Sequence, residues 1–199
     1  MDKIGIAKVF ILVIAAIFLS GCTSLSTSPV QSPTSSTTDP EFNHLLLSPE
    51  DLPPGLIRVV DGPMKASNIT DTMRKYGLQK GHWALYADTI AVTDKTKIME
   101  QDIMIFDGTN ASAMLDDYRK SLTDIQKKNI VATPLTDPNL GEKSFAVKVS
   151  AEGASGAETY NYYFGFVQSG IFEIISMEGT PETYSALLHV AERAAEKAR

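Results

Sequence analysis

Apolar and polar positions alternate along two pairs of neighbouring segments, which predicts two β-hairpins. Within Ile98–Phe106, Glu100 and Asp102 alternate with apolar residues, and the apolar segment Trp83–Val92 lies just before it, across the short polar stretch Asp94–Thr96. Strand-like segments joined by so short a connection pair antiparallel. The second hairpin and three further strands are predicted at Tyr160–Gln168 with Ile171–Met177, Leu56–Val60, Asn129–Leu135 and Phe145–Val149.

Helix signals occur between these strands. Apolar residues recur at a spacing of 3.6 over Ala111–Ile125 and again after Thr180–Glu182. Ser48–Asp51 has an N-cap, a first-turn proline and acids, and Thr70–Tyr76 is a short helix closed by glycine. The order of elements predicts an α+β fold, a mainly antiparallel β-sheet with helices packed on one face, preceded by a signal peptide and a disordered linker.

The first 21 residues have the pattern of a secretory leader rather than of a folded element. Lys3 and Lys8 precede Val9–Leu19, an unbroken run of 11 apolar residues. A signal-peptide hydrophobic region has this length, whereas a membrane-spanning helix needs about 20 residues. We therefore expect residues 1–21 to be removed from the mature protein.

Leu19-Ser20-Gly21-Cys22 resembles the lipobox of prokaryotic lipoproteins at all four positions. The resemblance implies that the thiol of Cys22 receives a diacylglyceryl group and that Cys22 becomes the new N-terminus. An ordinary signal peptide with an incidental cysteine is the alternative. Each buried CH₂ of an acyl chain contributes about 0.8 kcal/mol, so two chains hold a protein firmly on a membrane. This predicts an extracytoplasmic location, with the domain anchored to a cell membrane by lipid.

A polar spacer separates Cys22 from the rest of the chain. Of the 18 residues in Thr23–Pro40, 14 are Ser, Thr or Pro. Such a segment has too little apolar surface to offset the entropy of ordering, so we expect a disordered linker over residues 22–40. The remaining 159 residues, Glu41–Arg199, are enough for one α+β domain with a substantial core.

The composition of the chain excludes several classes of ligand and partner. The net charge of -6 argues against nucleic-acid binding, which needs a basic surface. A single cysteine excludes a disulfide framework and a cysteine-rich zinc site. No phosphate-binding or dinucleotide-binding glycine motif occurs in the sequence. We expect no cofactor, no metal and no nucleic-acid partner.

The order of predicted elements over most of Glu41–Arg199 is similar to that of the PsbP/Mog1/LpqN-like group, compact domains that often occur in secreted lipoproteins. The similarity rests on element order alone, because no diagnostic motif accompanies it. It therefore implies a fold and carries over no functional residue.

Candidates for catalysis are few. A hydrolase triad needs a nucleophile, a base and a carboxylate that converge in space, and no Gly-x-Ser-x-Gly motif is present. His44, His82 and His189 are widely separated in the sequence. Edge or partly buried structural histidines are the favoured interpretation.

The acidic segments also have plain structural explanations. The loop Asp137–Glu142 offers oxygen ligands of the kind that calcium prefers, but it lacks the spacing of an EF-hand, so a proline-led turn is favoured. The pair Glu50-Asp51 complements a helix N-terminus, and Asp116-Asp117 lies on the polar side of its helix. Neither pair requires an acid–base role.

One strand is unusually aromatic and is the candidate ligand-binding face. Alternation places one row on the same face, and its members are Tyr160, Tyr162, Phe164 and Phe166. With Trp83 nearby, Tyr160, Tyr162 and Phe164 are candidates to line an apolar or sugar-binding groove. The favoured alternative is a core row under a helix. Gly165, on the opposite face, allows close approach of a side chain or ligand.

Asn68 and Asn110 each begin a glycosylation sequon. They are candidate modification sites only in a host that glycosylates extracellular proteins. One or two such sequons are expected by chance in a chain of this length.

Taken together, the sequence predicts a lipid-anchored, non-enzymatic domain outside the cytoplasm. We expect it to bind a small ligand or an envelope protein, with the membrane contacted through the acyl anchor at Cys22. An envelope hydrolase with an unrecognised site and a purely structural or assembly lipoprotein are the alternatives. The hydrolase requires titratable groups that meet in a cleft with strongly perturbed pKa values.

Overall fold

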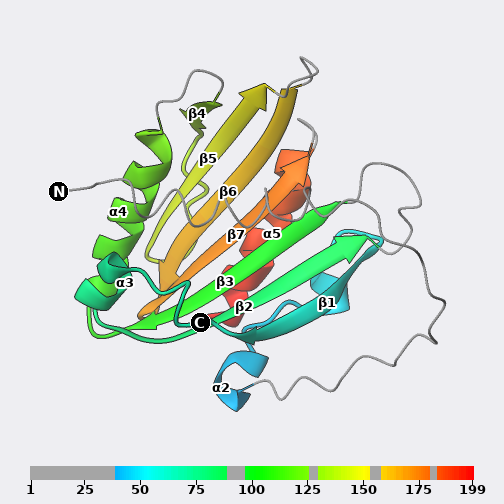
Figure 1. Cartoon of the computed structure of the whole chain (residues 1–199). Helices are drawn as coiled ribbons and strands as arrows, with labels where there is room; N and C mark the ends of the chain where they lie inside the picture. The colour runs from blue at the N-terminus through cyan, green and yellow to red at the C-terminus, as the bar shows by residue number, and fades with distance from the viewer. Residues whose placement is uncertain (1–38, 89–96, 126–129, 153–157, 180–182) are drawn as a thin grey trace, which may run out of the picture.

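Seven antiparallel strands form a single sheet in the order β1-β2-β3-β7-β6-β5-β4 (Figure 1). The computed structural model describes residues 39–88, 97–125, 130–152, 158–179 and 183–199; the predicted leader, Cys22 and most of the linker lie outside these ranges. The strands are β1 Leu56–Pro63, β2 Leu78–Asp88, β3 Ile98–Phe106, β4 Ile130–Pro134, β5 Lys143–Glu152, β6 Glu158–Gln168 and β7 Ile171–Gly179. The predicted α+β fold class, with a mainly antiparallel sheet, is confirmed.

The helical elements are α2 Pro40–Asn43, the 3₁₀ turn η1 Pro49–Asp51, α3 Asp71–Lys75, α4 Asn110–Thr123 and α5 Thr183–Lys197. The side chain of Asp39 caps α2 by accepting a hydrogen bond from the Glu41 amide. The short helix predicted at Thr70–Tyr76 is α3, and Thr70 is its N-cap, whose hydroxyl accepts a hydrogen bond from the Met73 amide. Within the described ranges, no helix combines the length and apolar character that crossing a membrane requires.

Both predicted hairpins are present and are joined side by side. The turn between β6 and β7 uses Ser169 and Gly170, both with positive φ angles. The β2–β3 pairing is antiparallel, although the predicted turn at Asp94–Thr96 lies outside the described residues. Pairing of β3 with β7 brings the two hairpins together in the middle of the sheet.

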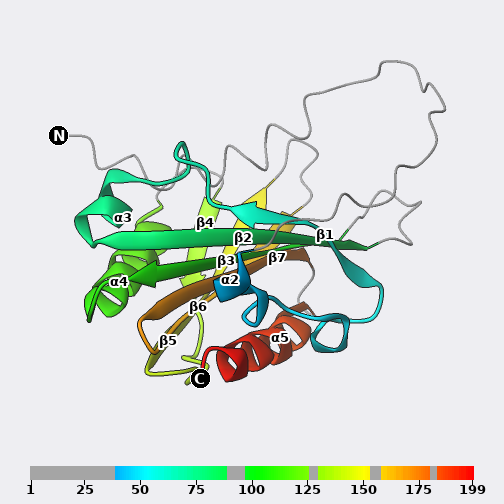
Figure 2. The same ribbon diagram turned by 90° about the horizontal axis from the view of Figure 1, so that it is seen from below.

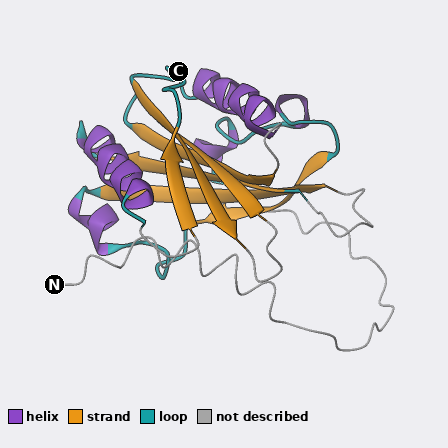
Figure 3. Cartoon of the chain, turned by 90° about the horizontal axis from the view of Figure 1, so that it is seen from above, coloured by secondary structure: helices purple, strands orange, loops and turns teal. Residues whose placement is uncertain are grey.

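The prediction that the helices pack on one face is wrong, because α4 and α5 cover opposite faces (Figures 2 and 3). The reason lies in β6. Tyr162 and Phe164 pack in the cluster that contains α5 residues, whereas Tyr163 and Val167 pack in the cluster that contains α4 residues. A strand that is apolar on both faces requires cover on both.

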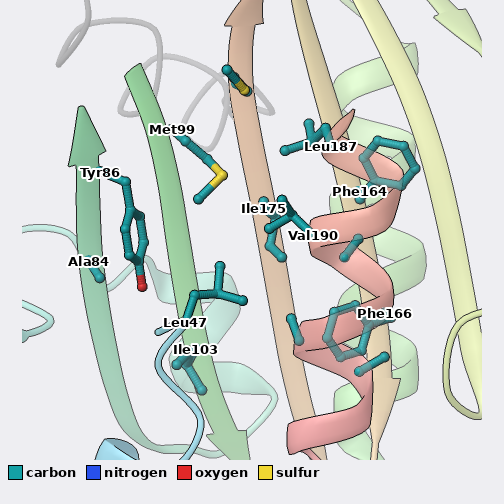
Figure 4. Close-up of a cluster of buried hydrophobic side chains, with 14 of the residues drawn as sticks. Leu47, Ala84, Tyr86, Met99, Ile103, Phe164, Phe166, Ile175, Leu187 and Val190 are labelled. Atoms are coloured by element: carbon teal, nitrogen blue, oxygen red, sulfur yellow. The ribbon is translucent and has the colours of Figure 1, made fainter. Parts of the chain in front are cut away.

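The core on the α5 face joins the middle of the sheet to the N-terminal segment (Figure 4). Leu187 and Val190 of α5 pack with Ile175 and Phe164. Helix α2 and the segment that follows it complete this cluster with four side chains that are at most 3% exposed: Phe42, Leu45, Leu46 and Leu47. The sequence analysis assigned no element to these residues.

Gly165 confirms the expected close approach on its face, and the approaching group is a side chain of the same domain. The ring of Phe145, its cross-strand neighbour, lies over Gly165, so that a Cβ atom built there would be 2.3 Å from Phe145 Cε1. Any larger residue at position 165 therefore displaces this ring from the α4 core.

Candidate functional site

Part of the α4 face lies beyond the core that α3 and α4 form on it. Helix α4 contacts β3 to β7, and its cluster ends before Trp83, Leu85 and Val60. We call this region the open half-face and define it by six residues: Val60, Trp83, Leu85, Glu100, Asp102 and Ser176. It is part of the face turned toward the viewer in Figure 1, opposite α5.

Strand register brings these six side chains together. Trp83 lies directly opposite Asp102, and Leu85 lies opposite Glu100. Ser176 flanks Glu100 from the other side, on β7. Directly opposite residues in an antiparallel pair have Cβ atoms about 4.5–5.5 Å apart, so they are within contact distance.

The two carboxyl groups of the open half-face are removed from water without a compensating cation. Asp102 is 5% exposed and Glu100 is half-buried. They are two residues apart on one strand face, about 7 Å along β3. Burial raises the pKa of Glu100, and burial together with the nearby Glu100 raises the pKa of Asp102 well above its usual range. Like charges at this separation disfavour the doubly ionised state.

Two tyrosines lie between this carboxyl pair and the α4 core. Burial, with a contribution from Glu100, raises the pKa of Tyr163 to about 12. Tyr118 of α4 is 2% exposed and packs against Phe145 and Phe172. Both phenols are therefore neutral at physiological pH and extend the aromatic lining toward the helix.

The aromatic residues singled out in the sequence do not share one groove. Tyr162 and Phe164 are 4% and 0% exposed, and both rings pack against Tyr184 of α5. Tyr160 is half-buried at the margin of the same cluster, where its hydroxyl donates to Glu158. Trp83 lies on the opposite face. This placement agrees with the favoured alternative, a core row under a helix.

The histidines do not meet the carboxyl pair either. His82 is 1% exposed, stacks on Phe42 and pairs with Asp61 at 3.2 Å. Register places it on the α5 face, since it lies opposite Ile103. His189 is exposed on α5 beside Glu192, and His44 is exposed after α2.

The acidic loop Asp137–Glu142 is held by its own side chains. Asp137 accepts hydrogen bonds from the Asn139 amide and the Ser144 hydroxyl, and Glu142 accepts one from the Ser169 amide. Across the described parts of the chain, no group of three or more His, Cys, Asp or Glu side chains is arranged to hold a metal ion.

A cavity of about 340 Å³ lies beside this loop, between α4 and the β4–β5 edge. Arg119 and Thr123 contribute to one wall, and Leu135 and Phe145 contribute apolar surface. Its buried hydroxyl, Ser144, accepts from the Leu140 amide and donates to Asp137, so its hydrogen-bonding groups are used within the domain.

The acid pairs and sequons have structural surroundings that the sequence only partly predicts. Asp51 bonds Ser48, Arg193 and Lys197, whereas Glu50 is exposed. Asp116 pairs with Lys143 and Arg119, and Asp117 accepts from the Tyr76 hydroxyl. Asn68 is half-buried in a turn and Asn110 is exposed at the start of α4, so the use of both sequons stays a prediction.

A buried polar network on the α5 face was not predicted from the sequence. Gln101 donates to Glu173 at 2.6 Å and accepts from the Tyr86 hydroxyl at 2.6 Å. It also bonds the backbone of Leu45 and Leu47, which fixes the N-terminal segment on the sheet. Burial raises the pKa of Glu173 to about 8, and its Oε2 atom has no hydrogen-bond partner. The sequence does contain one signal of this network, because Glu173 is a single acid within an otherwise apolar part of β7.

Comparison with known proteins identifies the fold and no family. No protein-family model and no curated protein matches the chain. The extracellular domain of PknH from Mycobacterium tuberculosis is similar, with a TM-score of 0.52, 10% identity and coverage of 76% of this chain and 93% of that domain. At this identity the similarity establishes a shared fold alone.

LpqN from Mycobacterium tuberculosis, described as involved in cell envelope biogenesis, is similar to a lesser degree. Its TM-score is 0.34 at 10% identity, with coverage of 73% of this chain and 78% of LpqN. A score this low adds nothing to the fold assignment. Membership of the PsbP/Mog1/LpqN-like group therefore stays a prediction from element order.

Proposed function

We propose that this chain is a lipid-anchored extracytoplasmic domain, without enzymatic activity, that binds a small ligand or an envelope protein through the open half-face. The observation that carries the binding role is the combination of half-buried Trp83 and Leu85 with buried Asp102 on a sheet surface that no described helix covers. Apolar surface with a few polar groups is the usual composition of a binding site.

The anchoring role rests on the sequence. An apolar run, the match at Leu19–Cys22 and a Ser/Thr/Pro-rich spacer follow one another in the order that a tethered domain requires. The fold shared with the extracellular domain of PknH supports a location outside the cytoplasm.

The competing hydrolase role requires a nucleophile or base beside the paired carboxyls. Glu100 and Asp102 satisfy one condition for such a site, because both pKa values are raised. The two histidines that lie near carboxylates, His82 and His189, are on the other face of the sheet or on the helix that covers it. Binding is therefore the better-supported role.

The test uses the full chain expressed in its own cells, as wild type and three variants. Cys22→Ser is expected to abolish lipid labelling and release the domain from the membrane. Val60→Arg places a bulky cation on the open half-face and is expected to remove a ligand or partner that co-purifies with the wild type in native mass spectrometry.

Val131→Arg is the matched control. Val60 and Val131 are 42% and 59% exposed and lie on the two edge strands, but Val131 is on the α5 face. Unchanged lipid labelling of Cys22→Ser contradicts the anchor. Equal recovery of bound material with Val60→Arg and wild type contradicts binding at the open half-face and favours a structural role.

A further inference from the structure

The carboxyls of the open half-face lack the counter-charge that the buried Asp51 has. Asp51, also buried, pairs with Arg193 and Lys197. Within the described residues, no ion pair or hydrogen bond involves the carboxyl of Asp102 or Glu100. A buried carboxyl without a partner costs free energy, which a bound cation would recover.

The aromatic lining suits an organic rather than an inorganic cation. Trp83 is the direct cross-strand neighbour of Asp102, and Tyr163 is two strands from Glu100 in the same register row. A cation held by these carboxyls therefore has aromatic faces beside it, and indole is the side chain that binds cations best through its π-face. Metal ions prefer several oxygen ligands, and the described residues supply no such cluster here.

The remaining neighbours provide apolar contact. Leu85 lies two residues from Trp83 along β2, and Val60 of β1 lies opposite Leu85. A ligand with an apolar part next to its charge would bury these side chains while its charge meets the carboxyls. A neutral ligand would leave both acids without the opposite charge that favours their ionised form.

Resting on the binding role proposed above, we propose that the open half-face binds an organic cation. Its ligand is a small molecule with an ammonium or guanidinium group on an apolar body. Asp102 and Glu100 supply the counter-charge, and Trp83 supplies the aromatic wall.

The chain itself provides the reporter, because Trp83 is its only tryptophan. The experiment titrates the full chain, in non-ionic detergent, with tetramethylammonium and with tert-butanol, a neutral molecule of similar shape. We expect a saturable change in Trp83 fluorescence with tetramethylammonium and none with tert-butanol over the same concentrations.

Variants then assign the effect to the carboxyls. Asp102→Asn and Glu100→Gln keep the side-chain shape, and each is expected to weaken tetramethylammonium binding about tenfold, as loss of a moderate ion contact does. Asp124→Asn, at an exposed acid that follows α4, is the matched control and is expected to bind as the wild type does. Equal unfolding midpoints verify that the variants are folded.

Two outcomes of the titrations would overturn the proposal. One is an equal response to tert-butanol and tetramethylammonium, and the other is unchanged affinity in both carboxyl variants. In the native mass spectrometry, a neutral or anionic molecule that co-purifies with the wild type but not with Val60→Arg would also refute a cationic ligand. The binding role itself would then stand. Loss of the binding role itself is recognised separately, by the absence of any material that depends on Val60.

Discussion

At the scale of single residues, the surroundings of two buried acids, Glu173 and Asp102, distinguish their roles. Glu173 interrupts an apolar strand and is fully buried, and among the described residues only Gln101 donates a hydrogen bond to it. Asp102 has the same burial on the other face but meets no described hydrogen-bond partner. The first acid therefore belongs to the internal structure of the domain, and the second lies on the face that we propose as the binding surface.

Glu173 predicts a fall in stability as the pH rises. Its pKa moves from 4.5 to about 8 on folding, so between these values the folded state holds a proton that the unfolded state has lost. The free energy of unfolding then decreases with pH by up to about 1.4 kcal/mol per unit. The penalty is absent below pH 4.5 and complete above about pH 8.

Urea unfolding of the wild type and Glu173→Gln across this range measures the effect. The variant keeps an oxygen that accepts from Gln101 and cannot ionise, so we expect a shallower decrease and a relative gain in stability at alkaline pH. The stability of the variant still decreases somewhat with pH, because the pKa values of Glu100 and Asp102 are raised too. Glu152→Gln, at an exposed position, is the control. Identical slopes for wild type and Glu173→Gln would contradict the assignment.

At the scale of elements, Asp51 links the start of the domain to its end. It lies in η1, and its carboxylate meets Arg193 at 3.2 Å and Lys197 at 3.1 Å in the last turns of α5. Burial alone would raise the pKa of Asp51, but hydrogen bonds from Ser48 and Lys197 lower it to about 2. These contacts hold η1 and α5 against each other across the α5-face core.

Asp51→Asn is expected to destabilise the domain by about 1.5–3 kcal/mol, the range for hydrogen bonds to charged groups. Because the folded pKa of Asp51 is lowered from 3.8 to about 2, its contribution is present above pH 3.8 and disappears as the pH falls through about 2. Chemical unfolding at neutral and acidic pH measures both effects.

Glu196→Gln is the control for this link. Glu196 pairs with the same Arg193 at the surface, where an ion pair contributes less than about 1 kcal/mol. If Asp51→Asn and Glu196→Gln lower stability equally, the link between η1 and α5 is no stronger than a surface contact.

At the scale of the whole molecule, the sheet is covered unequally. On the α5 face the helix and the segment 42–47 cover the middle of the sheet, whereas on the α4 face the helix leaves the β1–β2 end open. The N-terminal segment is therefore part of the fold rather than part of the spacer.

Truncation tests where the folded domain begins. A chain that starts at Asp39 is expected to retain the thermal stability of the full protein. A chain that starts at Ser48 loses Phe42 and Leu45–Leu47 from the core, and each such side chain contributes roughly 1.5–3 kcal/mol. That loss approaches the whole stability of a typical domain, about 5–15 kcal/mol, so we expect the shorter chain to unfold. Circular dichroism melts compare the two, and equal melting temperatures would contradict this role for the segment.

Local signals in the sequence are enough to predict individual helices and hairpins. Periodicity over Ala111–Ile125 predicts α4, and the turn at Ser169-Gly170 predicts the β6–β7 hairpin, because these signals depend only on neighbouring residues. The expected lipid at Cys22 also comes from the sequence alone, since that residue lies outside the described structure.

What covers each face of the sheet follows from the packing of elements that are far apart in the sequence. Alternation shows that Glu100 and Asp102 share a face, but not that this face loses water around them, because burial depends on the neighbouring strands β2 and β7 and their side chains. The same limit applies to Tyr162 and Phe164, whose burial depends on α5. Solvent exposure is set by contacts between residues far apart in the chain, and one sequence pattern fits both a core and a binding surface.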